Sequence, residues 1–170
     1  EAGRSRRHRA LRAAGVALCG AAFTLHSAGL ALRTFIMERP PVTNLYSTFL
    51  FAAWAAGVAA LLAVVRRRGP LARGGAVVAA ILLMVAGRYE ADGDTMARVV
   101  AVLDSNLWLT AHVMTIMLGY AGCLLAGAIA HGALWTAVRH GPGAAAESFR
   151  AVRGCLAFGL VFTFIGTTLG

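Results

Sequence analysis

Residues 108–138 have the sequence WLTAHVMTIMLGYAGCLLAGAIAHGALWTAV, which contains no Asp, Glu, Lys or Arg. The hydrocarbon core of a bilayer is about 30 Å thick and is crossed by about 20 residues of α-helix. An uncharged apolar segment longer than this is typical of a transmembrane helix that is tilted or that extends beyond the headgroups. The segment therefore predicts a membrane protein.

Four further apolar segments have a length that suits a transmembrane helix or falls just short of it: 13–32, 46–65, 71–87 and 152–170. The segment at 71–87 is the weakest, because Arg73 and two glycines interrupt its start. The whole chain of 170 residues is 59% hydrophobic and only 14% charged, whereas a soluble domain carries about 25% charged residues. The sequence predicts an all-α, polytopic membrane helix bundle of about five transmembrane helices, in one membrane domain that covers residues 1–170.

The arginines predict the orientation of the bundle. If the N-terminus is cytoplasmic, twelve of the sixteen arginines fall in inside segments (1–12, 66–73 and 139–153) and four in outside segments that also carry five acids. Cytoplasmic loops are enriched in arginine, so this asymmetry supports five helices and a cytoplasmic N-terminus. The net charge of +9 thus identifies a side of the membrane, and no nucleic-acid partner is expected.

Other motifs predict little chemistry. The three cysteines lie within apolar segments and form no C-x-x-C pair, so neither a disulfide framework nor a zinc site is expected. The segment 88–107 is acidic, and it is either a solvated loop or a weak cation site, because its E-A-D-G-D order lacks the full ligand set of a calcium loop. The first apolar segment is longer than the region of about 7–15 residues in a cleavable signal peptide. We therefore expect it to be a retained helix.

His112 is the histidine with the most informative position. It lies one turn inside the outer end of its predicted helix and follows Trp108, which is typical of an interfacial anchor. Gly119 and Cys123 share its helical face, and small residues let helices pack closely in lipid. We therefore expect His112 to point into protein at the outer membrane boundary. A metal or haem ligand and a structural hydrogen bond are both open interpretations.

The other two histidines within predicted spans are less specific. His26 lies toward the outer leaflet and suits either a ligand or a polar contact to a neighbouring helix. His131 lies near the cytoplasmic end of its helix, close to Trp135, and an interfacial role is favoured.

The outer segment 39–46, RPPVTNLY, predicts a rigid corner between the first two helices. Pro40 and Pro41 prevent the first helix from continuing. Thr43 or Asn44 is suited to cap the second helix by accepting a hydrogen bond from its first free amides.

Two motifs give this sequence a family resemblance. Pro41-Val-Thr-Asn-Leu-Tyr46 precedes the second helix, and Ser105-Asn-Leu-Trp-Leu-Thr-Ala-His-Val113 with Leu118-Gly-Tyr-Ala121 opens the fourth. In order and interval they resemble the CcsA/ResC-type cytochrome c biogenesis proteins, a haem-handling membrane family. The resemblance covers about residues 30–170.

The resemblance implies a multi-pass protein of the bacterial cytoplasmic (inner) membrane. Such a protein binds or presents haem b at the outer face for covalent attachment to the C-x-x-C-H motif of apocytochrome c, together with a CcsB/ResB-type membrane partner subunit or fused domain. The family's outer axial ligand to haem iron corresponds here to His112, while Trp108 and His26 are weaker candidates for haem binding.

The sequence also departs from the family's pattern. Family members continue beyond a helix like FIGTTLG (164–170) into an outer tryptophan-rich haem segment with further histidines, so we expect a fragment that is truncated at both ends and inactive alone. Ser47 stands where many relatives carry an acid.

Two other functions are open. A small-solute transporter or channel subunit would have His26, His112 and His131 lining one polar path, although transporters usually show broken helices and polar clusters at the midplane. An inert membrane scaffold is the third possibility, because a fold does not fix a function.

Overall fold

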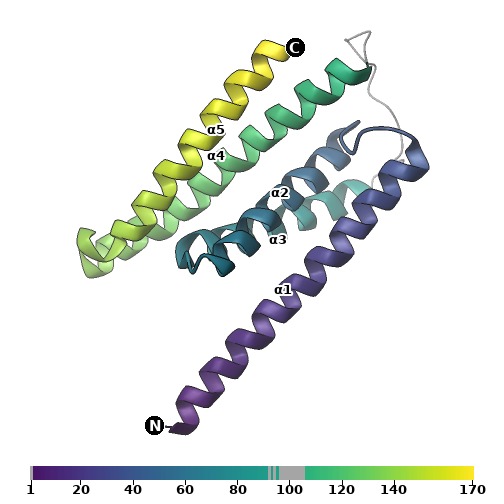
Figure 1. Cartoon of the computed structure of the whole chain (residues 1–170). Helices are drawn as coiled ribbons and strands as arrows, with labels where there is room; N and C mark the ends of the chain where they lie inside the picture. Colours follow the sequence, from purple (N-terminus) through teal and green to yellow (C-terminus); the bar gives the residue numbers. More distant parts are fainter. Residues whose placement is uncertain (1, 92, 94, 96–105) are drawn as a thin grey trace.

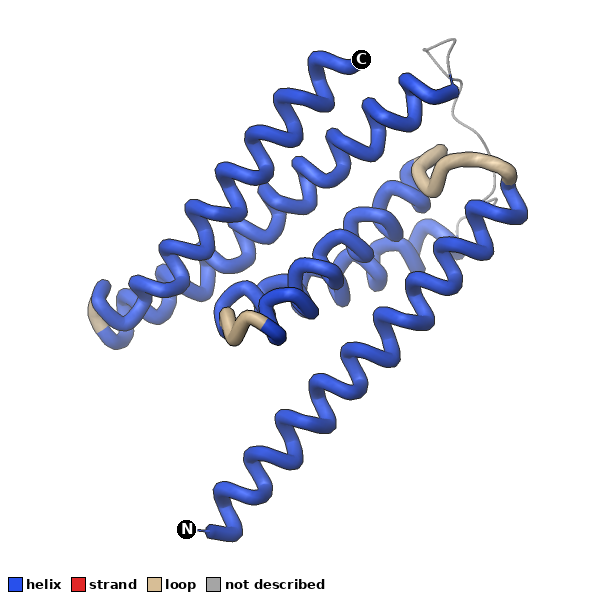
Figure 2. The backbone as a smooth tube through the Cα atoms, viewed as in Figure 1, coloured by secondary structure: helices blue, strands red, loops and turns tan. Residues whose placement is uncertain are grey.

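The computed structural model describes residues 2–91, 93, 95 and 106–170, and in these residues every regular element is a helix (Figures 1 and 2). The elements are α1 (Ala2–Met37), α2 (Leu45–Val65), α3 (Gly69–Ala91), α4 (Asn106–His140), the short 3-10 helix η1 (Pro142–Ala145) and α5 (Ala146–Leu169). The five α-helices are each long and apolar enough to cross a membrane. The predicted all-α polytopic bundle is confirmed.

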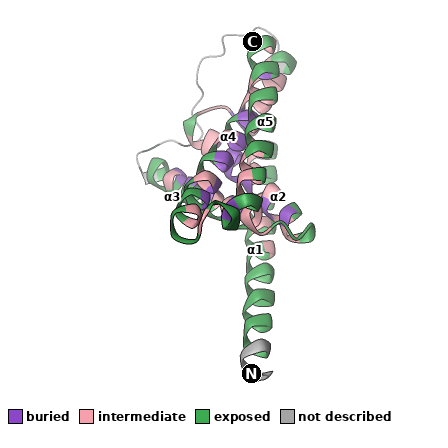
Figure 3. Ribbon diagram, turned by 90° about the vertical axis from the view of Figure 1, so that its left-hand side faces the viewer, coloured by how far each residue is buried: buried purple, intermediate pink, exposed green. Residues whose placement is uncertain are grey.

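The helices form two antiparallel pairs and one separate helix. The pair α2–α3 lies beside the pair α4–α5, while α1 contacts the bundle through its C-terminal half and diverges from it toward the N-terminus (Figure 1). Residues 6–19 of α1 are accordingly exposed (Figure 3). The helix extends well before the predicted span of 13–32, because most residues of its first turns are alanine or arginine, which are strong helix formers.

The α1–α2 corner, the start of α4 and the C-terminus lie at one end of the bundle, and the α2–α3 and α4–α5 turns lie at the other (Figure 1). This alternation is the one that the arginine distribution predicts. We call the first the outer end and the second the inner end; which of them faces the cytoplasm stays a prediction.

Glycines bring α4 and α5 into backbone contact. A Cβ atom added to Gly159 would lie 2.9 Å from the backbone nitrogen of Cys123 and 3.0 Å from the carbonyl oxygen of Gly119. A Cβ atom on Gly122 would in turn lie 2.9 Å from the Cα atom of Gly159. The predicted close-packing face around Gly119 and Cys123 therefore exists, and its partner is α5.

The pair α2–α3 is packed through small side chains. Ala53 and Ala56 are fully buried in a core with Val78 and Leu82 of α3, and Leu125 of α4 joins this core. A second cluster joins Leu30 of α1, Val42 of the corner, Phe51 of α2 and Met117 of α4. Together the two clusters hold both helix pairs and the end of α1 in one bundle.

The α1–α2 corner stops one helix and starts the next. Glu38 has a φ of 50°, and the N–H groups of Glu38 and Arg39 donate to the carbonyls of Phe35 and Thr34, which is the Schellman pattern of a helix end. Asn44 then caps α2: its side chain accepts from the N–H of Ser47, and the Ser47 hydroxyl accepts from the N–H of Asn44. The predicted corner is confirmed, with Asn44 as the cap.

The α2–α3 turn uses the same device. Arg67 has a φ of 55°, and the N–H groups of Arg67 and Arg68 donate to the carbonyls of Val64 and Ala63. Helix α3 begins directly at Gly69. This turn therefore holds three consecutive arginines at the inner end of the bundle.

Candidate functional site

His112 lies in the contact between α4 and α5. Its ring nitrogen Nδ1 is 2.7 Å from the carbonyl oxygen of Gly166 on α5. The side chain is half-buried, which agrees with its expected direction into protein at the outer end. The hydrogen bond joins residues 54 positions apart in the chain, so it depends on the packing of the helix pair.

This hydrogen bond determines which ring nitrogen is free. A carbonyl oxygen can only accept, so Nδ1 carries the proton and Nε2 keeps a lone pair in the neutral ring. Within the described part of the chain, no residue forms a hydrogen bond with Nε2 of His112. Metal-ligating histidines usually donate their other ring N–H to a carbonyl or carboxylate, which fixes the tautomer and the ring orientation. His112 has the arrangement of such a ligand.

Gly166 of α5 and Gly170, the residue directly after this helix, leave the space that the His112 ring needs. A Cβ atom on Gly166 would lie 2.8 Å from the backbone nitrogen of Ile116, so any side chain there would push the helices apart. A Cβ atom on Gly170 would collide with the imidazole of His112. Trp108 lies one turn before His112 on the same face and is 53% exposed. An aromatic surface therefore borders the histidine at the outer end of the bundle.

The α1–α2 corner at the same end is held by polar contacts. Ser47 is 1% exposed, and its hydroxyl oxygen accepts from the N–H groups of Thr43 and Asn44, both at 2.9 Å. Asn44 also donates from its side chain to the carbonyl of Thr95, at 2.8 Å. Ser47 is thus a buried structural residue of this corner.

Arg33 links α1 to this corner. Its guanidinium group lies 4.9 Å from the ring centre of Tyr46 and donates to the carbonyl of Thr95, while Nε is buried without a partner among the described residues. The sequence indicated only that Arg33 ends the first apolar segment. No sequence signal predicts its contact with Thr95, 62 positions away.

His26 and His131 lie elsewhere. His26 is half-buried between α1 and α2, beside the backbone of Leu50, and its Nε2 is enclosed without a partner in the described part of the chain. His131 is exposed on α4, with Nδ1 2.7 Å from the carbonyl oxygen of Gly127 on its own helix. The three histidines lie in three separate contacts, which weakens the transporter hypothesis of one histidine-lined path.

Some predicted features fall outside the described residues. Ser105 of the second motif and Asp92, Asp94 and Asp104 of the acidic segment are among them. Conversely, the sequence missed Gly166 and Gly170 as the partners of His112. The spacing of Gly159 and Gly166, one heptad apart on α5, is the signal that could have indicated a second close-packing face.

Comparison with known proteins gives two similar sequences. Cytochrome c biogenesis protein CcsA of Gloeothece citriformis is 36% identical over 98 residues, which cover 53% of this chain and 28% of that protein. About half of this chain is thus related to a cytochrome c biogenesis protein. Protein NrfI of Wolinella succinogenes is 29% identical over 98 residues, 58% of this chain and 10% of that protein.

The matched regions span only 28% and 10% of the lengths of these two relatives. No family model matches the chain, and no solved structure is significantly similar to it. The match to CcsA supports a relation to cytochrome c biogenesis proteins, and this support does not depend on the contacts around His112.

Proposed function

We propose that this chain is the haem-binding part of a cytochrome c assembly protein in the bacterial inner membrane, with His112 as an axial ligand to haem iron. The observation that carries the proposal is the hydrogen bond from Nδ1 of His112 to Gly166, which leaves Nε2 without a partner among the described residues. The relation to CcsA supports it, because that protein is named for cytochrome c biogenesis.

The chain's own residues would bind and orient the haem. His112 supplies one nitrogen at the outer end of α4, and the α5 backbone fixes the direction in which that nitrogen points. Trp108, exposed one turn away, offers an apolar surface for the edge of the macrocycle. Haem b is the substrate of this process, and the protein contributes ligation and orientation rather than the bond-forming chemistry.

The family resemblance implies a second axial ligand, and we propose that it comes from another part of the full protein or from a partner. Among the described residues, His26 and His131 lie in contacts separate from that of His112, and no three metal-binding side chains cluster. We therefore expect the second ligand outside this chain, with apocytochrome c and a CcsB/ResB-type subunit or fused domain as partners.

The test replaces His112 in the full-length protein and expresses it in a bacterium that lacks its own cytochrome c assembly proteins. His112→Ala should abolish the reduced haem absorption bands of the purified protein and reduce the yield of c-type cytochrome at least tenfold. His112→Met should retain haem with shifted bands, because an axial thioether changes the iron's electronic environment.

His131→Ala is the matched control, because it removes an exposed histidine from the same helix, where the ring is bonded only to the carbonyl of Gly127 on that helix. Its haem content and cytochrome yield should equal those of the wild type. Unchanged haem content in His112→Ala would refute the proposal.

A further inference from the structure

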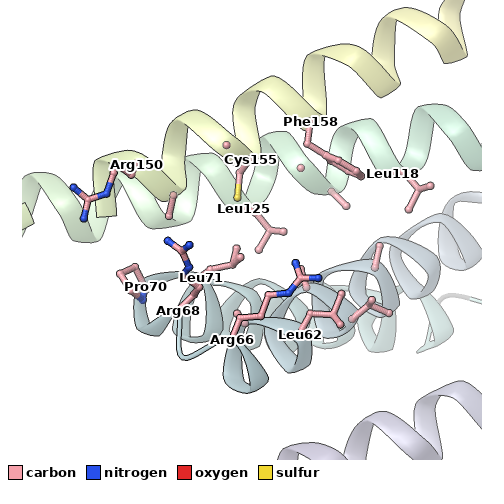
Figure 4. A pocket seen from close by; sticks show the side chains of 18 of the residues that line it. Leu62, Arg66, Arg68, Pro70, Leu71, Leu118, Leu125, Arg150, Cys155 and Phe158 are labelled. Atoms are coloured by element: carbon pink, nitrogen blue, oxygen red, sulfur yellow. The ribbon is translucent and has the colours of Figure 1, made fainter. Parts of the chain in front are cut away.

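A cavity of about 620 Å³ lies between the α2–α3 pair and the α4–α5 pair (Figure 4). Its walls are mostly apolar and come from four helices, with Leu62 of α2, Leu71 of α3, Leu125 of α4 and Phe158 of α5 among them. Its volume is within the range of about 300–1,000 Å³ that is typical of ligand sites. The cavity is separate from His112, which lies at the other end of the α4–α5 contact.

The inner end of the cavity is basic. Arg66 and Arg68 of the α2–α3 turn and Arg150 of α5 line it, with Glu147 as the one acid. All three arginines are exposed, and within the described part of the chain none of them forms an ion pair or a hydrogen bond through its guanidinium group. Figure 4 shows the side chains of Arg66 and Arg68 directed into the space between the helix pairs. The cavity thus combines apolar walls with a cationic mouth.

The backbone holds the arginines at this mouth. The Schellman pattern at the end of α2 fixes the turn that carries Arg66 and Arg68, and the first two turns of α5 carry Arg150. Arg68 and Arg150 therefore border the mouth from the two different helix pairs. In Figure 4 the guanidinium group of Arg150 points away from Arg68, so joint binding of one phosphate requires the Arg150 side chain to rotate toward the mouth. Arginine forms bidentate hydrogen bonds with phosphate.

We propose that this cavity binds one anionic phospholipid, with its phosphate at Arg66, Arg68 and Arg150 and an acyl chain along Leu62, Leu125 and Phe158. Inorganic phosphate has no apolar group that would contact the apolar walls. A zwitterionic lipid has no net negative charge to balance the excess of positive charge at the mouth. Basic pockets between transmembrane helices are suited to anionic lipid headgroups. This site goes beyond the proposed haem function, because it uses neither His112 nor the outer end of the bundle.

The experiment measures lipid retention by the full-length protein. The protein is purified in a mild detergent, incubated with equal amounts of phosphatidylglycerol and phosphatidylcholine of identical acyl chains, washed by detergent exchange, and analysed by native mass spectrometry. We expect about one phosphatidylglycerol per protein, retained at least fivefold over phosphatidylcholine. Inorganic phosphate alone, at the same concentration, should not displace it.

Three variants separate the site from general electrostatic attraction. R66Q/R68Q/R150Q should retain at least tenfold less phosphatidylglycerol than the wild type. R67Q/R73Q/R153Q removes the same charge from the inner end at residues that do not line the cavity, and it should retain the lipid. Gly154→Leu adds a side chain to the cavity wall where a Cβ atom meets nothing within 4 Å, and it should reduce retention without any change of charge.

Three results would overturn the proposal. An equal loss of phosphatidylglycerol in both arginine triple variants would show that the lipid is held only by the general positive charge of the inner end. Equal retention of both lipids would show an apolar groove without headgroup recognition. Retention of neither lipid, in a protein that unfolds at an unchanged temperature, would show that another segment of the full protein or haem occupies the cavity.

Discussion

The two ends of this bundle are constructed differently. At the outer end, glycine backbones bring α4 and α5 into contact, and hydrogen bonds fix His112, Asn44 and Ser47. At the inner end the helix pairs separate around a cavity, and the guanidinium groups of the arginines at its mouth have no protein partner among the described residues. The outer end is therefore suited to hold a histidine nitrogen in one fixed direction. The inner end is suited to bind an amphiphilic molecule, such as a phospholipid, that can move within its cavity.

The largest expected effect comes from breaking the contact at the outer end. Gly166→Leu should lower the free energy of unfolding by about 3 kcal/mol, because an added side chain in a packed interface forces the backbones apart. It also separates the Gly166 carbonyl from His112. The measurement is an SDS titration of the protein in bicelles, followed by circular dichroism.

The control for this change is Gly127→Leu on the exposed face of α4. A Cβ atom at Gly127 meets nothing within 4 Å, so this variant should be at least as stable as the wild type. Equal destabilisation by both substitutions would mean that the backbone contact of Gly166 has no special importance.

Removing the Ser47 hydroxyl is a smaller change at the same end. Ser47→Ala should lower the free energy of unfolding by about 2 kcal/mol, because two partly buried backbone N–H groups lose their acceptor. The same titration measures the effect. Thr136→Ala is the reference: its hydroxyl donates only to the carbonyl of Gly132 on its own helix, and its loss should cost less than about 0.5 kcal/mol. A neutral Ser47→Ala would show that the capping box contributes no net stability.

At the inner end, the substitution of Arg67 by glycine should stabilise the protein. Arg67 has a positive φ that glycine adopts without a steric penalty, so Arg67→Gly should raise the free energy of unfolding by about 1 kcal/mol. Arg73→Gly, the same substitution inside α3, should lower it by about 1 kcal/mol. The prediction fails if the two variants shift the titration midpoint in the same direction.

The smallest effect is expected for His26. Its Nε2 is enclosed without a partner among the described residues, so His26→Leu exchanges an unsatisfied polar group for an apolar one of similar size. The free energy of unfolding should stay within about 1 kcal/mol of the wild type. The haem content of the full-length protein should not change, and its loss would make His26 a ligand rather than a packing residue.

The sequence predicted the helices better than their partners. Apolar segments and arginine positions identified five helices, and the small residues around His112 identified a packing face on α4. Periodicity shows which face packs but not which helix it meets, so the Gly166 carbonyl was not predictable from residues near His112. The bond between Arg33 and Thr95 depends on how the C-terminal end of α1 meets a residue 62 positions later in the chain. The cavity depends on the divergence of two helix pairs, a property of the assembled bundle alone.

The partner of His112 is a main-chain atom, and this has a consequence for engineering. A carbonyl oxygen is supplied by every residue type, so the direction of the ring is encoded in the spacing of two helices rather than in a partner side chain. Copying His112 and its neighbours onto a different single helix would transfer the ligand nitrogen but not the hydrogen bond that orients the imidazole ring. The smallest portable unit is the glycine-packed hairpin of α4 and α5.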